Sequence, residues 1–293
     1  MDDGEVRLQV PGTEAAFLPH LGMLGVSLRH EATEVLALPG GLDAYRNGHV
    51  TGLPLLAPWA NRLGQRHYEI AGVAVDLEGI PLHDDGKGLP IHGTMTGQPG
   101  WEIVERTPAS LQVRFDYGAH AGLLAAFPFP HELVLDLELT ERRLRVSTTI
   151  RPTGNGSVPV SFGWHPYFRL PATRATTRLR LPYSQHLVLD DRGLPTGESE
   201  AQRGGWQPLD RAFDDLFALG EDRRLVLQGN GRSVTVELEE GYPFAQVYSP
   251  ADAPFACLES MTAPTNALVT GSCRLVEPGD DFTARFSITP GEL

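Results

Sequence analysis

The chain has 293 residues, of which 41% are hydrophobic and 21% are charged. This composition is typical of a folded globular protein and argues against disorder. The formal net charge of -13 repels phosphate groups, so we expect neither nucleic acid nor an anionic membrane as a partner.

The N-terminal segment, the cysteines and the lysine content bound the location and the chemistry. Met1-Asp2-Asp3-Gly4-Glu5 lacks the basic and apolar regions of a secretory signal, and no apolar run reaches the ~18 residues that cross a bilayer, so we expect a cytoplasmic protein. Cys257 and Cys273 are the only cysteines and lack the spacing of a zinc site or a disulfide scaffold. Lys87, the only lysine, lies between two glycines, which argues against Schiff-base and pyridoxal chemistry because a desolvated amine is hard to build there.

Apolar residues alternate with period two along much of the chain, which predicts β-strands. Gly229-Asn230-Gly231 is a turn sequence between two such segments and predicts a β-hairpin. In chain order, the clearest predicted strands cover residues 111–115, 133–139, 144–150, 225–227 and 234–238.

Helices are expected to be few and short. The 32 glycines and 24 prolines are spread along the chain and interrupt nearly every candidate helix, leaving only 42–47 and 210–219. Alternation of strands with long helices is missing, which argues against Rossmann and TIM folds. We therefore predict one all-β domain over residues 1–293, a large antiparallel β-sandwich with two sheets packed face to face.

The first candidate site segment is Pro-Trp-Ala-Asn-Arg-Leu-Gly at residues 58–64. Arg62 offers forked donors to sugar oxygens, and the amide of Asn61 offers both a donor and an acceptor. A surface turn with an exposed arginine is the alternative interpretation.

His92 is the next candidate, as a hydrogen-bond donor or proton carrier. Gly93 follows it, and a glycine lets a ligand or another strand approach closely. Upstream, His83, Asp84 and Asp85 are adjacent rather than spaced as metal ligands are. We therefore expect a solvated loop there and no metal.

Residues 163–168, Gly-Trp-His-Pro-Tyr-Phe, set His165 among three aromatic rings. Aromatic faces stack on the apolar face of a pyranose, and an imidazole can transfer a proton near neutral pH. The segment therefore indicates a sugar site, with a hydrogen-bonded core histidine as the alternative.

Two further segments offer polar groups that suit sugar hydroxyls. Asp214 and Asp215 lie between phenylalanines at 213 and 217, where a carboxylate either binds hydroxyls or caps a helix or turn. Gln246 and Tyr248 lie on one face of an expected strand and could line the same pocket.

Glu259 is the best candidate for a general base. It lies at the end of an apolar run, where partial desolvation raises the pKa of a carboxyl toward a value useful for proton abstraction. A glutamate that faces water at the end of a strand is the alternative.

Taken together, these segments resemble the aldose 1-epimerase, or galactose mutarotase, family. Each motif is short, but the six motifs in this order are much more specific than any single motif. Galactose-specific members have Asn-His-Ser-Tyr-Phe where this chain has Trp-His-Pro-Tyr-Phe at 164–168, so the chain is more similar to a mutarotase-like branch. The resemblance covers residues 61–266 and rests on Asn61-Arg62, His92-Gly93, His165-Pro166-Tyr167-Phe168, Phe213-Asp214-Asp215-Leu216-Phe217, Gln246-Val247-Tyr248 and Leu258-Glu259.

The resemblance implies a β-supersandwich isomerase that interconverts the α and β anomers of a free aldohexose without cofactor or metal. It implies that Glu259 is the base and His165 the acid, and that His92 with Arg62 holds the oxygens around the reacting centre. Asp214 is preferred to Asp215 because it directly follows Phe213 in the matching pattern. The substrate-binding residues implied in this way are Asn61, Arg62, Asp214, Gln246 and Tyr167.

Anomerisation requires the sugar to lose the O1 proton while O5 gains one. Glu259 as a carboxylate would take the first proton and His165 as an imidazolium would supply the second, with the roles exchanged on ring closure. A neighbouring carboxylate would keep His165 protonated near neutral pH. We therefore expect activity to depend on pH in a bell-shaped way.

Three alternatives stay open at this point. A non-catalytic carbohydrate-binding protein needs the aromatic and polar groups but no acid–base pair. A glycoside hydrolase would use Glu259 and Asp214 as paired carboxylates. A hexose-6-phosphate mutarotase would hold the phosphate with an arginine such as Arg66. We expect a small-molecule sugar as substrate and a protein that is a monomer or a homodimer.

Overall fold

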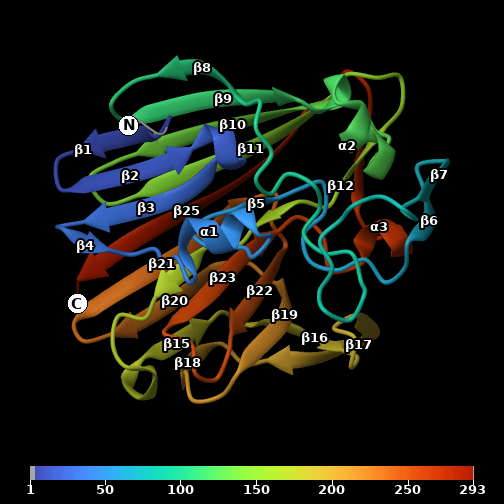
Figure 1. Cartoon of the computed structure of the whole chain (residues 1–293). Helices are drawn as coiled ribbons and strands as arrows, with labels where there is room; N and C mark the ends of the chain where they lie inside the picture. Colours follow the sequence, from blue (N-terminus) through green and yellow to red (C-terminus); the bar gives the residue numbers. More distant parts are fainter. Residues whose placement is uncertain (1–3, 293) are drawn as a thin grey trace.

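A computed structural model describes residues 4–292. Met1-Asp2-Asp3, the acidic start of the chain, and Leu293 lie outside the described residues. The described chain consists mostly of antiparallel strands, arranged in two large sheets and three smaller ones (Figure 1).

The larger sheet has nine strands, and every neighbouring pair in it is antiparallel. It contains the predicted strands at 111–115, 133–139, 144–150 and 234–238, and the predicted hairpin joins β20 (Arg224–Gly229) to β21 (Arg232–Glu240) around Asn230. These predictions are confirmed. In spatial order the strands are β18 (Gly205–Pro208), β15 (Arg178–Leu181), β20 (Arg224–Gly229), β21 (Arg232–Glu240), β25 (Phe282–Glu292), β11 (Leu144–Pro152), β10 (His131–Leu139), β9 (Ser110–Asp116) and β8 (Glu102–Arg106).

The second large sheet has eight strands and carries most of the candidate residues. In spatial order they are β17 (Pro195–Gln202), β16 (Ser184–Leu189), β19 (Phe213–Leu219), β22 (Phe244–Ser249), β23 (Phe255–Met261), β13 (Gly163–Trp164) and β5 (Leu55–Leu56), with β14 (Tyr167–Arg169) also paired to β23.

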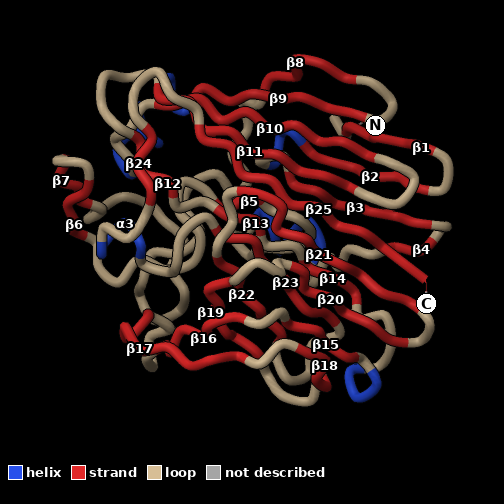
Figure 2. Tube along the Cα trace, turned by 180° about the vertical axis from the view of Figure 1, so that it is seen from behind, coloured by secondary structure: helices blue, strands red, loops and turns tan. Residues whose placement is uncertain are grey.

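The smaller sheets lie around these two. Strands β1 and β2 contact β10 of the nine-stranded sheet. Figures 1 and 2 both place the two-stranded sheets and α3 (Ala267–Thr270) on the opposite side from β4 (Thr33–Glu34). The small sheets are β1 (Val6–Val10) to β4 (Thr33–Glu34) through β2 (Thr13–Leu18) and β3 (Leu24–His30); β6 (His67–Ile70) with β7 (Val73–Asp76); and β12 (Val158–Val160) with β24 (Arg274–Val276).

The two large sheets pack face to face through buried aromatic and aliphatic side chains. Trp164 of β13 lies 6.0 Å, between ring centroids, from Phe286 of β25, and its indole N–H donates to Thr148 of β11 at 3.0 Å. This bond satisfies a polar group that would otherwise be costly to bury. The predicted all-β antiparallel sandwich is therefore confirmed.

The helices are short, as glycine and proline content predicted. The helix expected near 42–47 is present as α1 (Gly41–Arg46), whereas α2 (Ala121–Ala126) and α3 (Ala267–Thr270) were not predicted. The prediction of a helix at 210–219 is wrong, because residues Phe213–Leu219 form the strand β19. The backbone of β19 is hydrogen-bonded to β16 and β22 on its two sides, and this pairing outweighs the local helical tendency. No helix within residues 4–292 is long and apolar enough to cross a membrane.

Candidate functional site

The eight-stranded sheet turns one face toward the nine-stranded sheet and the other toward an open pocket of about 500 Å³. Alternation along β23 sends Ala256 and Leu258 into the main core and leaves Cys257 and Glu259 on the pocket side. All the predicted site residues except Gln246 line this pocket. Its lining is Gly48, His49, Val50, Asn61, Arg62, Asp84, Asp85, Gly86, Ile91, His92, His165, Tyr167, Asp214, Tyr248 and Glu259.

Glu259 and His165 meet at the base of the pocket. Trp164 pairs with Ser260 across β13 and β23, so the residue that follows Trp164 lies beside the one that precedes Ser260. The His165 Nε2 is 3.2 Å from the Glu259 Oε1, and the side chains are only 5% and 2% exposed. The structure thus brings together a candidate acid and a candidate base that are 94 residues apart in sequence.

Burial governs the protonation of this pair. Desolvation lowers the pKa of His165 to about 3, whereas desolvation and the nearby Asp214 raise the pKa of Glu259 well above its ordinary value. The expectation that a neighbouring carboxylate keeps His165 protonated is wrong, because removing both charges from water outweighs their attraction. The pair therefore favours a neutral imidazole beside a protonated carboxyl.

His92 faces His165 from a different segment of the chain. The two imidazole rings form an edge-to-face pair with centroids 5.5 Å apart. His92 has a φ of 66°, and its backbone N–H donates to the carbonyl of Asn61, whose own φ is 59°. Burial lowers the pKa of His92 well below its ordinary value. Its ring is therefore a neutral group at the pocket wall.

Arg62 is held by acceptors on several sides. Its Nε donates to Asp85 at 2.7 Å, its Nη1 donates to the side chain of Asn61 at 3.1 Å, and its Nη2 is 3.8 Å from Asp214. The side chain of Asp85 is only 1% exposed. It also accepts hydrogen bonds from the backbone N–H groups of Lys87 and Leu89. Burial alone would raise the pKa of Asp85, but Arg62 and these N–H groups lower it.

The loop that contains Asp84 and Asp85 is largely exposed, as expected, but the side chain of Asp85 is not solvated. Asp85 is a buried anchor for Arg62, and Asp84 binds Arg66 at 2.8 Å at the pocket wall. Sequence reasoning missed this role because the arginine partners lie about 20 residues away. The available signal was the turn sequence Asp-Gly-Lys-Gly that begins at Asp85. In this turn the carboxylate of Asp85 accepts hydrogen bonds from the backbone N–H groups of Lys87 and Leu89.

Asp214 lies on the pocket side of β19, and its neighbour does not. Asp214 accepts a hydrogen bond from the Gln246 Nε2 at 2.6 Å, so Gln246 lies directly behind it. Asp215 instead binds His186 and Arg211. Of the two adjacent carboxylates, the structure thus places only Asp214 in the pocket.

Aromatic side chains form another part of the pocket wall. The rings of Tyr167 and His165 are stacked, with centroids 4.7 Å apart and an interplanar angle of 8°. Tyr248 lies edge-on to His165 at 6.1 Å. Both tyrosines line the pocket, which gives it an apolar surface suited to the face of a sugar ring.

Several buried polar atoms around the pocket have no hydrogen-bond partner within residues 4–292. These atoms are therefore available for hydrogen bonds to a ligand or to water. The atoms are Nδ1 of His92, Nδ1 of His165, Oε1 of Gln246 and Oε2 of Glu259.

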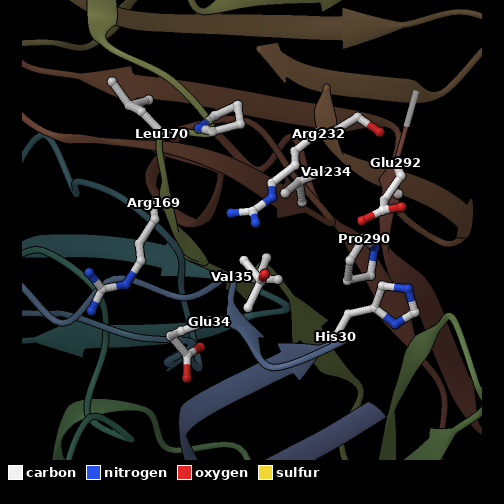
Figure 3. Close-up of a pocket in the computed structure, with 13 residues that line it drawn as sticks. His30, Glu34, Val35, Arg169, Leu170, Arg232, Val234, Pro290 and Glu292 are labelled. Atoms are coloured by element: carbon white, nitrogen blue, oxygen red, sulfur yellow. The ribbon is translucent and has the colours of Figure 1, made fainter. Parts of the chain in front are cut away.

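A second pocket, of about 170 Å³, lies between β3, β14, β21 and β25 and contains none of the predicted residues. Figure 3 shows Arg232 extending across it toward Val35, with His30 and Glu292 on another side. Glu34 in this pocket already accepts hydrogen bonds from the backbone N–H groups of Leu28 and Leu36.

Among residues 4–292, no group of three or more His, Cys, Asp or Glu side chains is arranged to hold a metal ion.

Solved structures of similar fold include three proteins from two bacteria. A galactose mutarotase-like protein from Clostridium acetobutylicum has a TM-score of 0.87 at 20% identity, over 99% of this chain and 95% of that one. A galactose mutarotase related enzyme from Lactobacillus acidophilus has a TM-score of 0.82 at 17% identity, over 98% and 97%. A galactose 1-epimerase from Lactobacillus acidophilus has a TM-score of 0.76 at 14% identity, over 98% and 94%.

Comparison with curated protein sequences gives no match. The sequence pattern of a family described as aldose 1-epimerase, however, matches residues 14–289, which is nearly the whole chain. This match and the shared β-sandwich agree with the resemblance found in the motifs. The chain belongs to the aldose 1-epimerase family.

Proposed function

We propose that the protein is an aldose 1-epimerase, an isomerase that interconverts the α and β anomers of a free aldohexose by opening and closing the sugar ring. The observation that carries this proposal is the buried contact between His165 and Glu259 at the base of a pocket with aromatic and polar walls. Anomerisation needs one group that takes a proton and one that gives it, and no further chemistry.

In the proposed mechanism, the pair holds one transferable proton. When the proton is on His165, Glu259 takes the O1 proton while His165 protonates O5, and the C1–O5 bond breaks to give the open aldehyde. Rotation about C1–C2 and the reverse transfers then close the ring to the other anomer. Each proton transfer typically contributes about 10²–10⁴-fold.

The protonation preference of the pair bears on this mechanism. A proton on Glu259 and a proton on His165 are two arrangements of the same singly protonated pair, so the observed pKa values belong to the pair as a whole. Burial favours the neutral arrangement, and sugar hydroxyls at the unpaired Oε2 of Glu259 and Nδ1 of His165 would stabilise the charged one. Activity should be lost where the pair gains a second proton or loses its last one.

The remaining lining residues would bind and orient the sugar. His92 and Arg62 would bind oxygens near the reacting centre. Asp214, which is held by Gln246, would accept hydrogen bonds from sugar hydroxyls. Asn61 would fix the guanidinium of Arg62. Tyr167, whose ring is stacked on His165, would hold that imidazole in place at the pocket wall beside the sugar.

A non-catalytic sugar-binding protein is a weaker account of the same pocket. Binding alone is served by aromatic rings and hydrogen-bonding groups at the wall. It gives no reason to bury an ionisable carboxyl against an imidazole, which costs free energy. The pair is therefore better explained by proton transfer.

The proposal is tested by following anomer exchange of freshly dissolved α-glucose and α-galactose by polarimetry or NMR. We expect the protein to accelerate exchange of at least one of these sugars in catalytic amounts. A methyl glycoside, which cannot open, should show neither anomer exchange nor release of sugar. Sugar release from the glycoside would favour a hydrolase, and binding without acceleration would favour a carbohydrate-binding protein.

The location and assembly stay predictions. We continue to expect a cytoplasmic protein that acts on a small sugar without cofactor or metal. We also expect a monomer or homodimer.

A further inference from the structure

We infer that the pocket selects aldoses by charge: it accepts neutral sugars and sugars that carry an ammonium group, and it rejects sugars that carry a phosphate or carboxylate. This inference rests on the proposed function and names the class of aldose on which the same site acts. Four observations support it.

The first observation is the balance of charged groups around the pocket. Three aspartates line it: Asp84, Asp85 and Asp214. Among the described residues, Arg62 is the only arginine or lysine in the lining. Asp84 is paired with Arg66 outside the lining and Asp85 with Arg62, so the charge of Asp214 leaves the pocket with a net negative balance. The net charge of the whole chain, -13, adds to the repulsion of an anion.

The second observation is that Arg62 is already engaged. Asp85 binds its Nε at 2.7 Å, and Asp214 lies 3.8 Å from its Nη2. Gly193 also lies close against the Arg62 guanidinium, so close that a Cβ added at Gly193 would lie 2.9 Å from the Arg62 Nη1. The guanidinium therefore has little free space on that side. A phosphate would therefore have to compete with Asp85 for a guanidinium with little room to turn, and it would approach the carboxylate of Asp214 as well.

The third observation concerns the other cations near the pocket. Arg66, considered from the sequence as a phosphate ligand, binds Asp84 at 2.8 Å and the carbonyl of Leu77, and it is not among the lining residues. Lys87, the only lysine in the chain, donates to the carbonyl of Asp191 and does not line the pocket either. Neither side chain is free to receive an anionic sugar.

The fourth observation is an accessible carboxylate. Asp214 has a side chain 47% exposed, and the guanidinium that lies nearest to it is shared with the buried Asp85. The separation of 3.8 Å is too long for a hydrogen bond from Arg62. Asp214 is therefore a group to which the ammonium of an amino sugar can pair.

The test uses sugars that differ only at C6: glucose, 6-O-methylglucose, 6-amino-6-deoxyglucose, glucose 6-phosphate and glucuronate. Anomer exchange is measured by NMR near pH ~7.5, where an imidazole of ordinary pKa is mostly neutral. The uncatalysed rate is subtracted for each sugar. The 6-O-methyl sugar controls for added bulk at C6.

We expect kcat/KM for the two anionic sugars to be at least about tenfold below that for glucose and its 6-O-methyl ether. The amino sugar should match or exceed glucose. Glucose 6-phosphate turned over as well as glucose would overturn the inference and leave the proposed function standing. No acceleration with any sugar, glucose included, would instead overturn the proposed function.

A variant isolates the electrostatic cause. Asp84→Asn removes one carboxylate from the lining and frees Arg66, so the ratio of kcat/KM for glucose 6-phosphate to that for glucose should rise by about two- to fivefold. Asp76→Asn is the matched control, because Asp76 is 65% exposed on β7 and does not line the pocket. Equal ratios in both variants and the wild type would contradict the electrostatic cause.

Discussion

The carboxylate of Asp85 determines where the guanidinium of Arg62 lies in the pocket. It is almost fully buried, binds Arg62 at 2.7 Å and is itself held by two backbone N–H groups. Without this anchor, Arg62 would be attracted to Asp214, the other carboxylate beside it. Asp85 thus acts through Arg62 as a positioning residue.

Asp85→Asn should therefore impair the proposed reaction while the protein stays folded. Asparagine keeps the shape of the side chain and removes its charge, and a hydrogen bond to a charged group contributes about 1.5–3 kcal/mol. We expect kcat/KM on glucose to fall by about 10- to 100-fold, as measured by polarimetry.

Asp76→Asn removes an exposed carboxylate outside the pocket and serves as the control. Partial recovery of kcat/KM in Asp85→Glu, which restores the charge, would support a positioning role. Wild-type kcat/KM in a folded Asp85→Asn protein would contradict it.

At the residue scale, much of the candidate site could be predicted from the sequence. His165, Glu259 and Asp214 lie in motifs whose order resembles one family, and the structure brings all three to one pocket. The anchoring role of Asp85 could not be predicted, because it depends on a contact with Arg62 that only the folded chain creates. The prediction that His165 is protonated was wrong for a related reason. The burial that lowers the pKa of His165 results from tertiary packing, which the sequence does not show locally.

The irregular segments between strands, rather than the strands alone, shape the pocket wall. His92 and Gly93 both have positive φ, and an added Cβ at Gly93 would lie 2.1 Å from the carbonyl oxygen of Ala57. This close approach is possible only for glycine. The segment therefore depends on Gly93 to hold His92 at the pocket wall.

Gly93→Ala should destabilise the protein strongly. A positive φ costs a residue with a Cβ about 1–2 kcal/mol, and overpacking adds about 1–3 kcal/mol, so the free energy of unfolding should fall by about 2–5 kcal/mol. Urea denaturation followed by circular dichroism measures the change.

Gly72→Ala is the matched control. Gly72 has a φ of 73°, but an added Cβ there meets no atom within 4 Å, so only the backbone strain should be observed. Equal losses of stability in the two variants would show that the contact with Ala57 does not matter.

At the element scale, prediction succeeded where strands are long and alternate regularly. The strands β9, β10, β11 and β21 have 7 to 9 residues and a clear period of two. In contrast, β5 and β13 have two residues each, too few to show a period, although β13 positions His165. The strand β19 was predicted as a helix because its pairing with β16 and β22 is not visible locally.

The whole molecule is held together by pairings between distant parts of the chain, and these could not be predicted from local patterns. The C-terminal strand β25 lies between β21 and β11. Two sheets packed face to face were predictable from composition and alternation, but this order of strands was not. The order matters because it brings segments around residues 62, 92, 165 and 259 to one pocket.

Buried histidines in different parts of the fold should make the stability of the molecule sensitive to acid. Desolvation lowers the pKa of His131 to about 4, of His165 to about 3 and of His92 well below 6.5. Below 6.5 the unfolded chain binds protons at these sites and the folded chain does not, so stability falls as pH decreases. The raised pKa of Glu259 has the opposite effect above 4.5 and offsets part of this loss of stability.

The free energy of unfolding should therefore fall by about 2–3 kcal/mol per pH unit between about pH 6.5 and pH 5, since each net proton contributes about 1.4 kcal/mol per unit. Urea denaturation over a pH series measures this slope. A free energy of unfolding that stays constant or rises on acidification through this range would contradict it.

The central claim is that Glu259 and His165 together move the protons of anomerisation, and the most direct measurement is the turnover of Glu259→Gln in the anomer exchange assay. Glutamine keeps the size of the side chain and cannot take or give the proton, so we expect kcat to fall by about 10²–10⁴-fold with a modest change in binding. Circular dichroism would establish that the variant is folded. Turnover near the wild-type value in the folded variant would contradict the claim.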